Sequence, residues 1–175
     1  MKKYFRIKAI SVTIAILIIG FVFLNFHFPL IDGENFLGVI VALSTLYYGF
    51  LVYKIEDDKM FKDLFESFNK KYDDKFNDFL NKIRSNKNIE INAEKKDKII
   101  DYFNLSAEEY LWYRKGRIPN DVWKAWESGM VDNINLPQIL KIFIEETKTE
   151  NGKESYYGLY EKIEPRLKKH SLDNN

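Results

Sequence analysis

Two long apolar runs lie within the first 53 residues, one from Ala9 to Phe28 and one from Phe36 to Tyr53. Only the segment from Pro29 to Asn35 separates them, and neither run contains an Asp, Glu, Lys or Arg. A helix needs about 20 largely apolar residues to cross a hydrocarbon core of roughly 30 Å. The sequence therefore predicts a transmembrane helical hairpin over residues 1–55, with spans at about 9–28 and 36–53.

The distribution of charge predicts the orientation of this hairpin. The connector carries Asp32 and Glu34 but no Lys or Arg, whereas basic residues flank the two runs: Lys2, Lys3, Arg6, Lys8, Lys54, Lys59 and Lys62. Lys and Arg concentrate on the cytoplasmic side of membrane proteins. We therefore expect a two-pass protein of the bacterial inner membrane with both termini in the cytoplasm. A cleaved signal peptide is the alternative, although the first run is longer than a usual signal-peptide core.

Small residues form a stripe along each predicted span. The stripe contains Gly20 in the first span and Gly38, Ala42, Thr45 and Gly49 in the second. Such stripes let helix backbones approach closely in lipid. These stripes serve either the contact between the two helices of the hairpin or contacts between chains. We expect the protein to contact the lipid bilayer and to form a homo-oligomer.

Residues 56–92 are expected to form an amphipathic connecting helix followed by a polar break. Its apolar face repeats every eleven residues and contains Phe61, Phe65, Phe68, Tyr72, Phe76, Phe79 and Ile83. Eleven residues in three turns mean that, if this face self-associates, the bundle should be nearly straight or slightly right-handed. Three surfaces compete to cover this face: the C-terminal domain of the same chain, an oligomeric stalk, and the inner leaflet of the membrane.

Residues 93–175 are expected to form a compact cytosolic bundle of four or five short helices, so that the whole chain is all-α. Ser106 and Glu109 have the spacing of a capping box, which predicts a new helix at Ser106. Pro165 is expected to kink or interrupt the last helix. Predicted helices cover residues 93–104, 106–116, Pro119 to Met130, Pro137 to Ile144 and 156–169, with a loop over 147–155.

The composition argues against most chemistry. The chain has no Cys and only two His, its formal net charge is +1, and residues 54–175 are close to neutral. A basic excess typical of broad nucleic-acid binding is absent, although a short oligonucleotide remains an open ligand. Asp101, Glu108 and Glu109 could in principle perform acid–base chemistry, but their spacing is that of a solvated helix face. We therefore expect no enzymatic activity, and no catalytic, metal-binding or cofactor-binding residue.

One turn combines aromatic and basic side chains. Its candidate ligand or partner contacts are Tyr113, Arg114, Lys115 and Arg117, and Trp123 and Trp126 follow on the next predicted helix. Rings beside guanidinium groups can hold a base by stacking. The structural alternative is that the basic residues complement a helix C-terminus and the rings belong to the core.

The stretch from Ser106 to Met130 resembles a group of bacterial membrane proteins. The resemblance rests on the paired acids, the turn ending in Gly116, and the two tryptophans, and it extends over about residues 93–150. These proteins have unknown function, one or two N-terminal spans and a small helical cytosolic domain, and are similar to defence-associated membrane effectors. The resemblance implies an effector that breaches the membrane when a sensor partner signals.

Two functions are therefore expected as alternatives. The first is a membrane-anchored cytosolic interaction or sensing module without catalysis, which binds a cytosolic protein or a small ligand. The second is an oligomeric pore-forming or membrane-disrupting effector of a bacterial antiviral, abortive-infection system.

Overall fold

The computed structural model describes residues 2–28, 31–86 and 88–168, and their side chains except those of residues 2–11 and 34. Within these ranges the chain is helical nearly throughout and contains no strand, which confirms the all-α fold. The chain divides into two compact units, unit 1 over Met1–Lys59 and unit 2 over Met60–Asn175.

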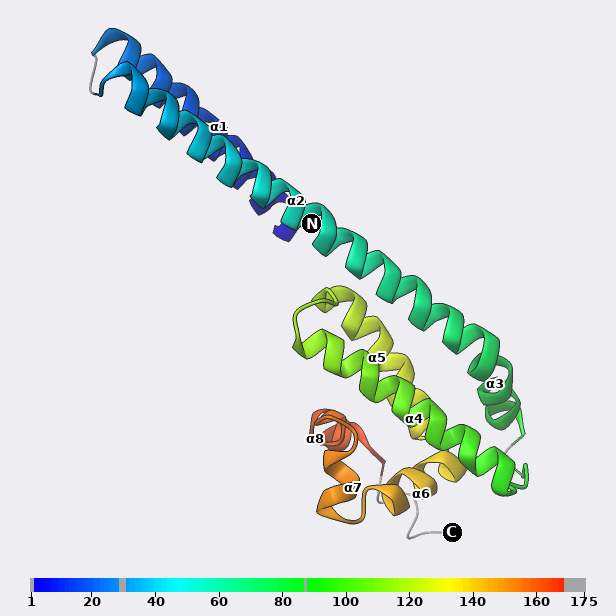
Figure 1. Cartoon of the computed structure of the whole chain (residues 1–175). Helices are drawn as coiled ribbons and strands as arrows, with labels where there is room; N and C mark the ends of the chain where they lie inside the picture. The colour runs from blue at the N-terminus through cyan, green and yellow to red at the C-terminus, as the bar shows by residue number, and fades with distance from the viewer. Residues whose placement is uncertain (1, 29–30, 87, 169–175) are drawn as a thin grey trace. The chain divides into compact units, whose positions relative to one another are not determined.

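Unit 1 consists of α1 (Lys2–His27) and the first part of α2 (Gly33–Tyr72), which run antiparallel (Figure 1). The ring of Phe21 stacks on that of Phe36 with their centroids 5.8 Å apart. The Asp32 carboxylate accepts a hydrogen bond from the backbone N–H of Asn35 at 2.9 Å, at the start of α2. Pro29, Leu30 and the basic side chains that precede the first run lie outside the described residues.

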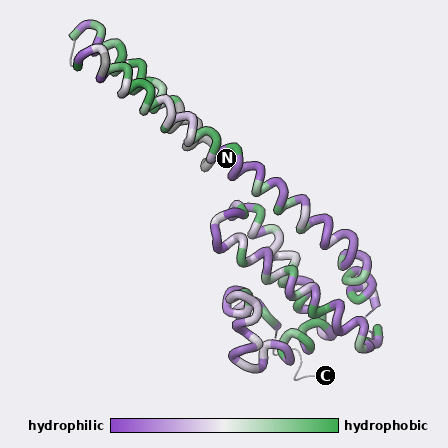
Figure 2. The backbone as a smooth tube through the Cα atoms, viewed as in Figure 1, coloured by the Kyte–Doolittle hydropathy of each residue, from purple (hydrophilic) through white to green (hydrophobic). Residues whose placement is uncertain are grey.

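Unit 1 is rich in hydrophobic residues (Figure 2), and many of its apolar side chains are exposed. Leu17, Ile19 and Leu46 are each more than 60 % exposed. Among the described side chains, one helix, Asn35–Ser85, contains an 18-residue window of mean hydropathy 1.9, and none of that window is buried. The described apolar part of α1, Val12–His27, is shorter. One helix near the N-terminus is therefore long and apolar enough to cross a membrane.

Unit 2 begins within α2, and a π-helical turn interrupts the regular helix expected over residues 61–83. This turn, η1 (Asp73–Asn77), leads into α3 (Asp78–Ser85). Phe68, Tyr72 and Phe76 follow one another at intervals of four residues. A π-helical turn holds more residues than an α-helical turn because its hydrogen bonds join residues i and i+5. The local widening therefore helps to keep these three rings on one face.

Helix α4 (Ala93–Arg114) is continuous, so the helix boundary predicted at Ser106 was wrong. The Ser106 hydroxyl donates to the carbonyl oxygen of Tyr102 at 2.9 Å inside the helix, and no capping box forms. The real start is at Asn92, whose side chain accepts a hydrogen bond from the backbone N–H of Lys95 at 3.0 Å. At the other end, Gly116 adopts a φ of +72°, which suits glycine in the turn after the helix.

The remaining helices are short, and two of them begin where proline predicted a start. They are α5 (Asn120–Ile134), α6 (Pro137–Glu146), α7 (Glu150–Glu154) and α8 (Leu159–Ile163). Helix α7 occupies the region predicted as a loop. Pro165 lies in a 3-10 turn, η2 (Glu164–Arg166), and α8 ends at Ile163, which confirms the interruption expected at this proline; the helix begins at Leu159 and not at residue 156 as predicted. His170 and the predicted helix end at Lys169 lie outside the described residues.

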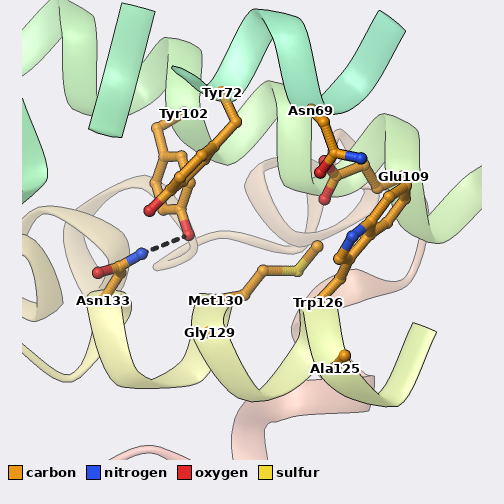
Figure 3. A pocket seen from close by; sticks show the side chains of 9 residues that line it. All are labelled: Asn69, Tyr72, Tyr102, Glu109, Ala125, Trp126, Gly129, Met130 and Asn133. Atoms are coloured by element: carbon orange, nitrogen blue, oxygen red, sulfur yellow. Dashed lines mark hydrogen bonds between the residues drawn. The ribbon is translucent and has the colours of Figure 1, made fainter. Parts of the chain in front are cut away.

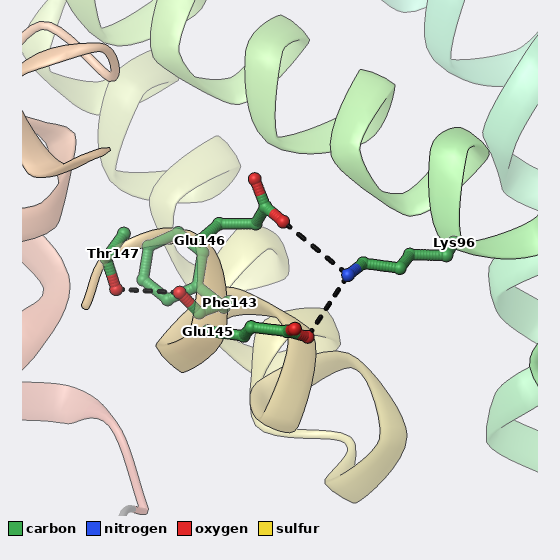
Figure 4. A network of polar contacts seen from close by, with 5 residues as sticks. All are labelled: Lys96, Phe143, Glu145, Glu146 and Thr147. Carbon is green, nitrogen blue, oxygen red and sulfur yellow. Dashed lines mark hydrogen bonds and ion pairs between the residues drawn. The ribbon is translucent and has the colours of Figure 1, made fainter. Parts of the chain in front are cut away.

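The core of unit 2 lies where α4, α5 and α6 meet. Phe103 of α4 and Phe143 of α6 are fully buried, and their rings meet edge to face at 4.9 Å. At the surface, Lys96 of α4 pairs with Glu145 at 3.1 Å and Glu146 at 3.8 Å at the end of α6 (Figure 4). Exposed ion pairs contribute little to stability, so the buried rings hold these helices together.

Candidate ligand-binding pocket

A cavity of about 230 Å³ lies inside unit 2, between the last turn of α2 and helices α4 and α5. Figure 3 shows side chains from all three helices converging on it. Its lining consists of Asn69, Tyr72, Tyr102, Glu109, Ala125, Trp126, Gly129, Met130 and Asn133. Most of this lining is aromatic or apolar, with a few polar groups, as in small-ligand sites.

Aromatic contacts hold the indole of Trp126 in the cavity wall. Its ring stacks on Phe65 of α2 at a centroid distance of 5.7 Å and an interplanar angle of 16°. Phe68, one turn further along α2, meets the indole edge-on at 5.9 Å. On another side of the cavity the rings of Tyr72 and Tyr102 lie 6.3 Å apart. The wall is therefore built from rings that support one another.

A chain of hydrogen bonds that reaches from the surface to the buried Tyr102 fixes the polar end of the cavity. The Asn133 amide donates to the Tyr102 hydroxyl at 3.2 Å (Figure 3) and accepts from the guanidinium of Arg84 at 2.6 Å. Asn133 is only 2 % exposed. Burial raises the pKa of the Tyr102 hydroxyl well above its ordinary value. Both polar groups of the Asn133 side chain are therefore used within the protein.

Glu109 is the unusual residue of the lining because it is 8 % exposed and has no hydrogen-bond or ion-pair partner among the described residues. Burial, helped by the neighbouring Glu108 carboxylate, raises the pKa of Glu109 to about 8, while Lys71 opposes this shift. Lys71 itself lies 3.5 Å from the carboxylate of Glu108. Buried carboxyl groups are normally hydrogen-bonded or paired, so the isolation of Glu109 requires an explanation.

The residues of the aromatic and basic turn predicted as a contact site do not line this cavity. Arg114 donates to the carbonyl oxygen of Tyr157 at 2.9 Å, and Lys115 lies 4.8 Å over the ring of Trp112. Tyr113 donates to the side chain of Asn120 at 3.1 Å. The backbone N–H of Arg117 donates to the carbonyl oxygen of Trp112 at 3.0 Å. The side chains of Tyr113, Arg114 and Lys115 thus contact other parts of unit 2.

The two tryptophans differ in their surroundings. Trp123 is 1 % exposed, and its ring stacks on Tyr113 at 4.9 Å. Its indole N–H is buried without a partner among the described residues. Trp126 is half-buried and lines the cavity. Trp123 therefore belongs to the core, whereas Trp126 has a surface that a ligand can reach.

The predicted apolar face of the connecting helix is buried to different degrees along its length. Phe68, Phe76 and Ile83 are at most 4 % exposed and belong to the core of unit 2. Tyr72 and Phe79 are half-buried against that core. Phe61 contacts Phe65 at 5.8 Å, and Phe65 is 38 % exposed.

In unit 1, the small-residue stripe of α2 is exposed. Gly38, Ala42, Thr45 and Gly49 all lie at the surface, whereas Phe36, Ile40, Leu43 and Tyr47 of the same helix are half-buried. A Cβ atom added at Gly20, Gly38 or Gly49 would meet nothing within 4 Å. These glycines therefore make no close contact with the side chains that the structure describes in the single chain.

Comparison of the chain with protein-family models, with curated proteins and with solved structures gives no match. Within the described part of the chain, no three His, Cys, Asp or Glu side chains are grouped as metal ligands. The cavity is therefore interpreted from its own residues.

Sequence reasoning set Glu109 aside as part of a solvated helix face and did not single out Asn133. The predicted break at Ser106 separated Glu109 from the buried residues before it. Along the continuous α4, Tyr102, Ser106 and Glu109 follow at intervals of four and three residues, which places them on one helix face. This periodicity is the signal that could have identified Glu109.

Proposed function

We propose that the chain is a two-span protein of the bacterial inner membrane that holds unit 2 in the cytoplasm as a non-catalytic interaction or sensing module. The observation that carries the proposal is the combination of an exposed apolar helix with a separately packed unit that contains a ligand-sized pocket. Anchoring and recognition would then be performed by different parts of one chain.

The exposed side chains of unit 1 support the anchoring role. Apolar side chains that remain exposed along a whole helix lose free energy in water, by about 25 cal/mol for each Å², and a bilayer relieves this cost. Helix α2 satisfies the length requirement by itself. The antiparallel α1, of 26 residues, would provide the second span, tilted if necessary.

The pocket supports the recognition role. Its lining combines Trp126, Tyr72 and Met130 with a few polar groups, which is the usual composition of small-ligand sites. The unpaired Glu109 carboxyl supplies a group whose burial is costly without a partner. A ligand that pairs with this carboxyl would remove that cost, so binding is favoured at this position.

Reporter fusions test the topology. A reporter that is active only outside the cytoplasm should give signal when it is inserted at Gly33 and none when it follows Asn175. The basic residues around the two runs are the physical reason. The reverse pattern, or a mature chain that begins near Pro29, would contradict the two-span proposal.

An oligomeric membrane-disrupting effector is the second candidate. The exposed stripe of Gly38, Ala42, Thr45 and Gly49 favours it, because this stripe is free for contact with another helix. In this case, binding at unit 2 would control the assembly of spans from several copies. The resemblance of residues 93–150 to defence-associated membrane proteins points in the same direction.

A further inference from the structure

We infer that the pocket takes a primary ammonium group on a small apolar stem, with the Glu109 carboxylate as its counter-ion and the ring of Trp126 beside it. This inference names the ligand class of the proposed binding module and rests on that proposed function.

The first argument is the state of Glu109. Its side chain is more than nine-tenths buried, it faces the cavity together with Asn69 (Figure 3), and no described residue pairs with it. The amide nitrogen of Asn69 donates to the carbonyl oxygen of Phe65 at 2.8 Å, which leaves the amide oxygen of Asn69 as a second unused acceptor. An ammonium group has three donors and no acceptor. It would therefore satisfy both residues.

The second argument is the sign of the charge around the cavity. Glu109 carries the only formal charge that the lining can have at neutral pH, since Tyr72 and Tyr102 are its other titratable members and α5 contributes none. Just outside the lining, Glu108 adds negative charge, and Lys71 is already 3.5 Å from Glu108. Arg84 is bonded to Asn133 at 2.6 Å. Lys71 and Arg84 are thus engaged by Glu108 and Asn133, so an ionised Glu109 carboxylate would be the charge that a ligand meets in the cavity, and it would attract a cation.

The third argument is the aromatic lining. Cations are attracted to the faces of Trp and Tyr rings, Trp most strongly. One face of the Trp126 indole is covered by Phe65, and the residue also lines the cavity. The apolar stem would contact Met130 and the tyrosine rings. The Glu109 carboxylate and the Trp126 ring thus favour the ammonium group, and Met130 and the tyrosine rings favour the apolar stem of the same ligand.

The size of the cavity restricts the ligand to a small one. At about 230 Å³, it is smaller than pockets for drug-sized ligands, which begin at about 300 Å³. Two sources of the same chemistry fit: a free small amine, or the lysine side chain of a partner protein. The experiment therefore tests both.

Binding of a cation requires the ionised carboxylate and so releases the proton that Glu109 holds below about pH 8. Affinity for an ammonium ligand should therefore increase as the pH rises from 6 to 8, by about tenfold or more in all. The groups that set this pH range are Glu109 itself, Glu108 on the same helix and Lys71 on α2.

The test uses the full chain in detergent and two probes, each with a neutral counterpart. The first probe is 2-phenylethylammonium, compared with 2-phenylethanol. The second is a pentapeptide with one central lysine, compared with the same peptide acetylated on that lysine. Binding is followed by isothermal titration calorimetry at pH 6 and pH 8. We expect at least one ammonium probe to bind and its neutral counterpart to bind at least about tenfold more weakly.

Two variants make the test specific. Glu109→Gln should weaken binding of the ammonium probe by about tenfold or more and abolish its pH dependence, since charge-assisted hydrogen bonds are the strong ones. Asp101→Asn removes a carboxylate from an exposed position on the same helix and should leave binding unchanged. Circular dichroism checks that both variants are folded.

The results distinguish a free amine from a partner's lysine side chain as the ligand, and they separate the ligand inference from the membrane proposal. Binding of the free amine alone indicates a small-molecule ligand, and binding of the lysine peptide alone indicates a protein partner. The inference is wrong if neither ammonium probe binds. It is also wrong if the neutral counterparts bind as tightly as the ammonium probes, or if binding of the ammonium probes weakens as the pH rises. The topology reporters are independent of this result, so the membrane proposal can stand or fail separately.

Discussion

Glu109 is 8 % exposed, its side chain lines the cavity, and no described residue donates a hydrogen bond to its carboxyl group. Protonation is the means by which the unliganded protein avoids a buried charge, because burial raises the pKa of this group from 4.5 to about 8. The proposed binding of an ammonium group would then depend on the ionised form of Glu109, which is the less stable form in the unliganded protein. Sites that bind or react commonly contain groups with shifted pKa values for this reason.

This pKa predicts how the stability of unit 2 depends on pH. Between about pH 4.5 and pH 8 the folded chain holds a proton on Glu109 that the unfolded chain has released. The contribution of Glu109 to the free energy of unfolding should be largest below pH 4.5 and should be lost as the pH rises through about 8. Glu109→Gln should remove this dependence and be more stable than the parent above pH 8, by several kcal/mol at most.

Denaturant unfolding at pH 5 and pH 9, followed by tryptophan fluorescence, measures this effect. Asp101→Asn is the control, because it removes an exposed carboxylate from the same helix. Equal slopes with pH for the parent and Glu109→Gln would show that Glu109 is already ionised in the folded protein at neutral pH.

Among the elements, the end of α2 belongs to the core of unit 2 and also lines the cavity of the proposed binding site. Phe68 packs on Trp126, and Tyr72 lines the cavity one turn later. The π-helical turn η1 follows at once and brings Phe76 into the core. π-helical turns are often found at functional sites. Here the turn adjoins the pocket, so the packing of α2 and the shape of the pocket are coupled.

Phe68→Asp tests whether this packing holds unit 2 together. Phe68 is 3 % exposed, so the substitution removes a buried ring and places a carboxylate among apolar side chains. We expect a loss of about 3 kcal/mol or more, and a clearly lower melting temperature in detergent. Ser67→Asp introduces the same charge at the exposed neighbouring position and should leave the melting temperature nearly unchanged. Similar melting temperatures for the two variants would contradict this role of Phe68.

At the scale of the whole molecule, variants in the exposed stripe of α2 test whether the chain assembles into an oligomer through this surface. Gly38→Leu and Gly49→Leu add bulk where a Cβ atom meets none of the described atoms of the single chain within 4 Å, so they should leave the fold intact. If the stripe contacts another chain, they should weaken the oligomer by holding the helix backbones apart. Ser44→Leu introduces the same leucine side chain at an exposed position beside the stripe and serves as the control.

Size-exclusion chromatography with light scattering in detergent measures the assembly, and a dye that reports membrane potential in cells measures its consequence. Depolarisation by the parent that disappears in the two leucine variants, but not in Ser44→Leu, would favour the effector over the anchored module. An unchanged oligomer in the Gly38→Leu and Gly49→Leu variants would show that the stripe is not an assembly surface.

Local patterns determined the helical class and several helix boundaries. Unbroken apolar runs mark α1 and the first part of α2, and Pro119 and Pro137 mark the starts of α5 and α6. These signals act within one or two helical turns, so they can be read without knowledge of the packing. Where a local signal was ambiguous, the prediction failed, as for Ser106, whose hydroxyl bonds within α4 and does not cap a new helix.

Only the tertiary structure determined where the pocket lies and which residues line it. Glu109 and its exposed neighbour Glu108 are the same residue type on the same helix, and no local pattern requires one of them to be buried. Their different environments arise because α2 and α5, distant in sequence, pack against one side of α4 and leave a cavity there. Hydrogen bonds likewise join three helices through Arg84, Asn133 and Tyr102. Burial of a polar group depends on what packs opposite it, and that is set by the fold of the whole chain.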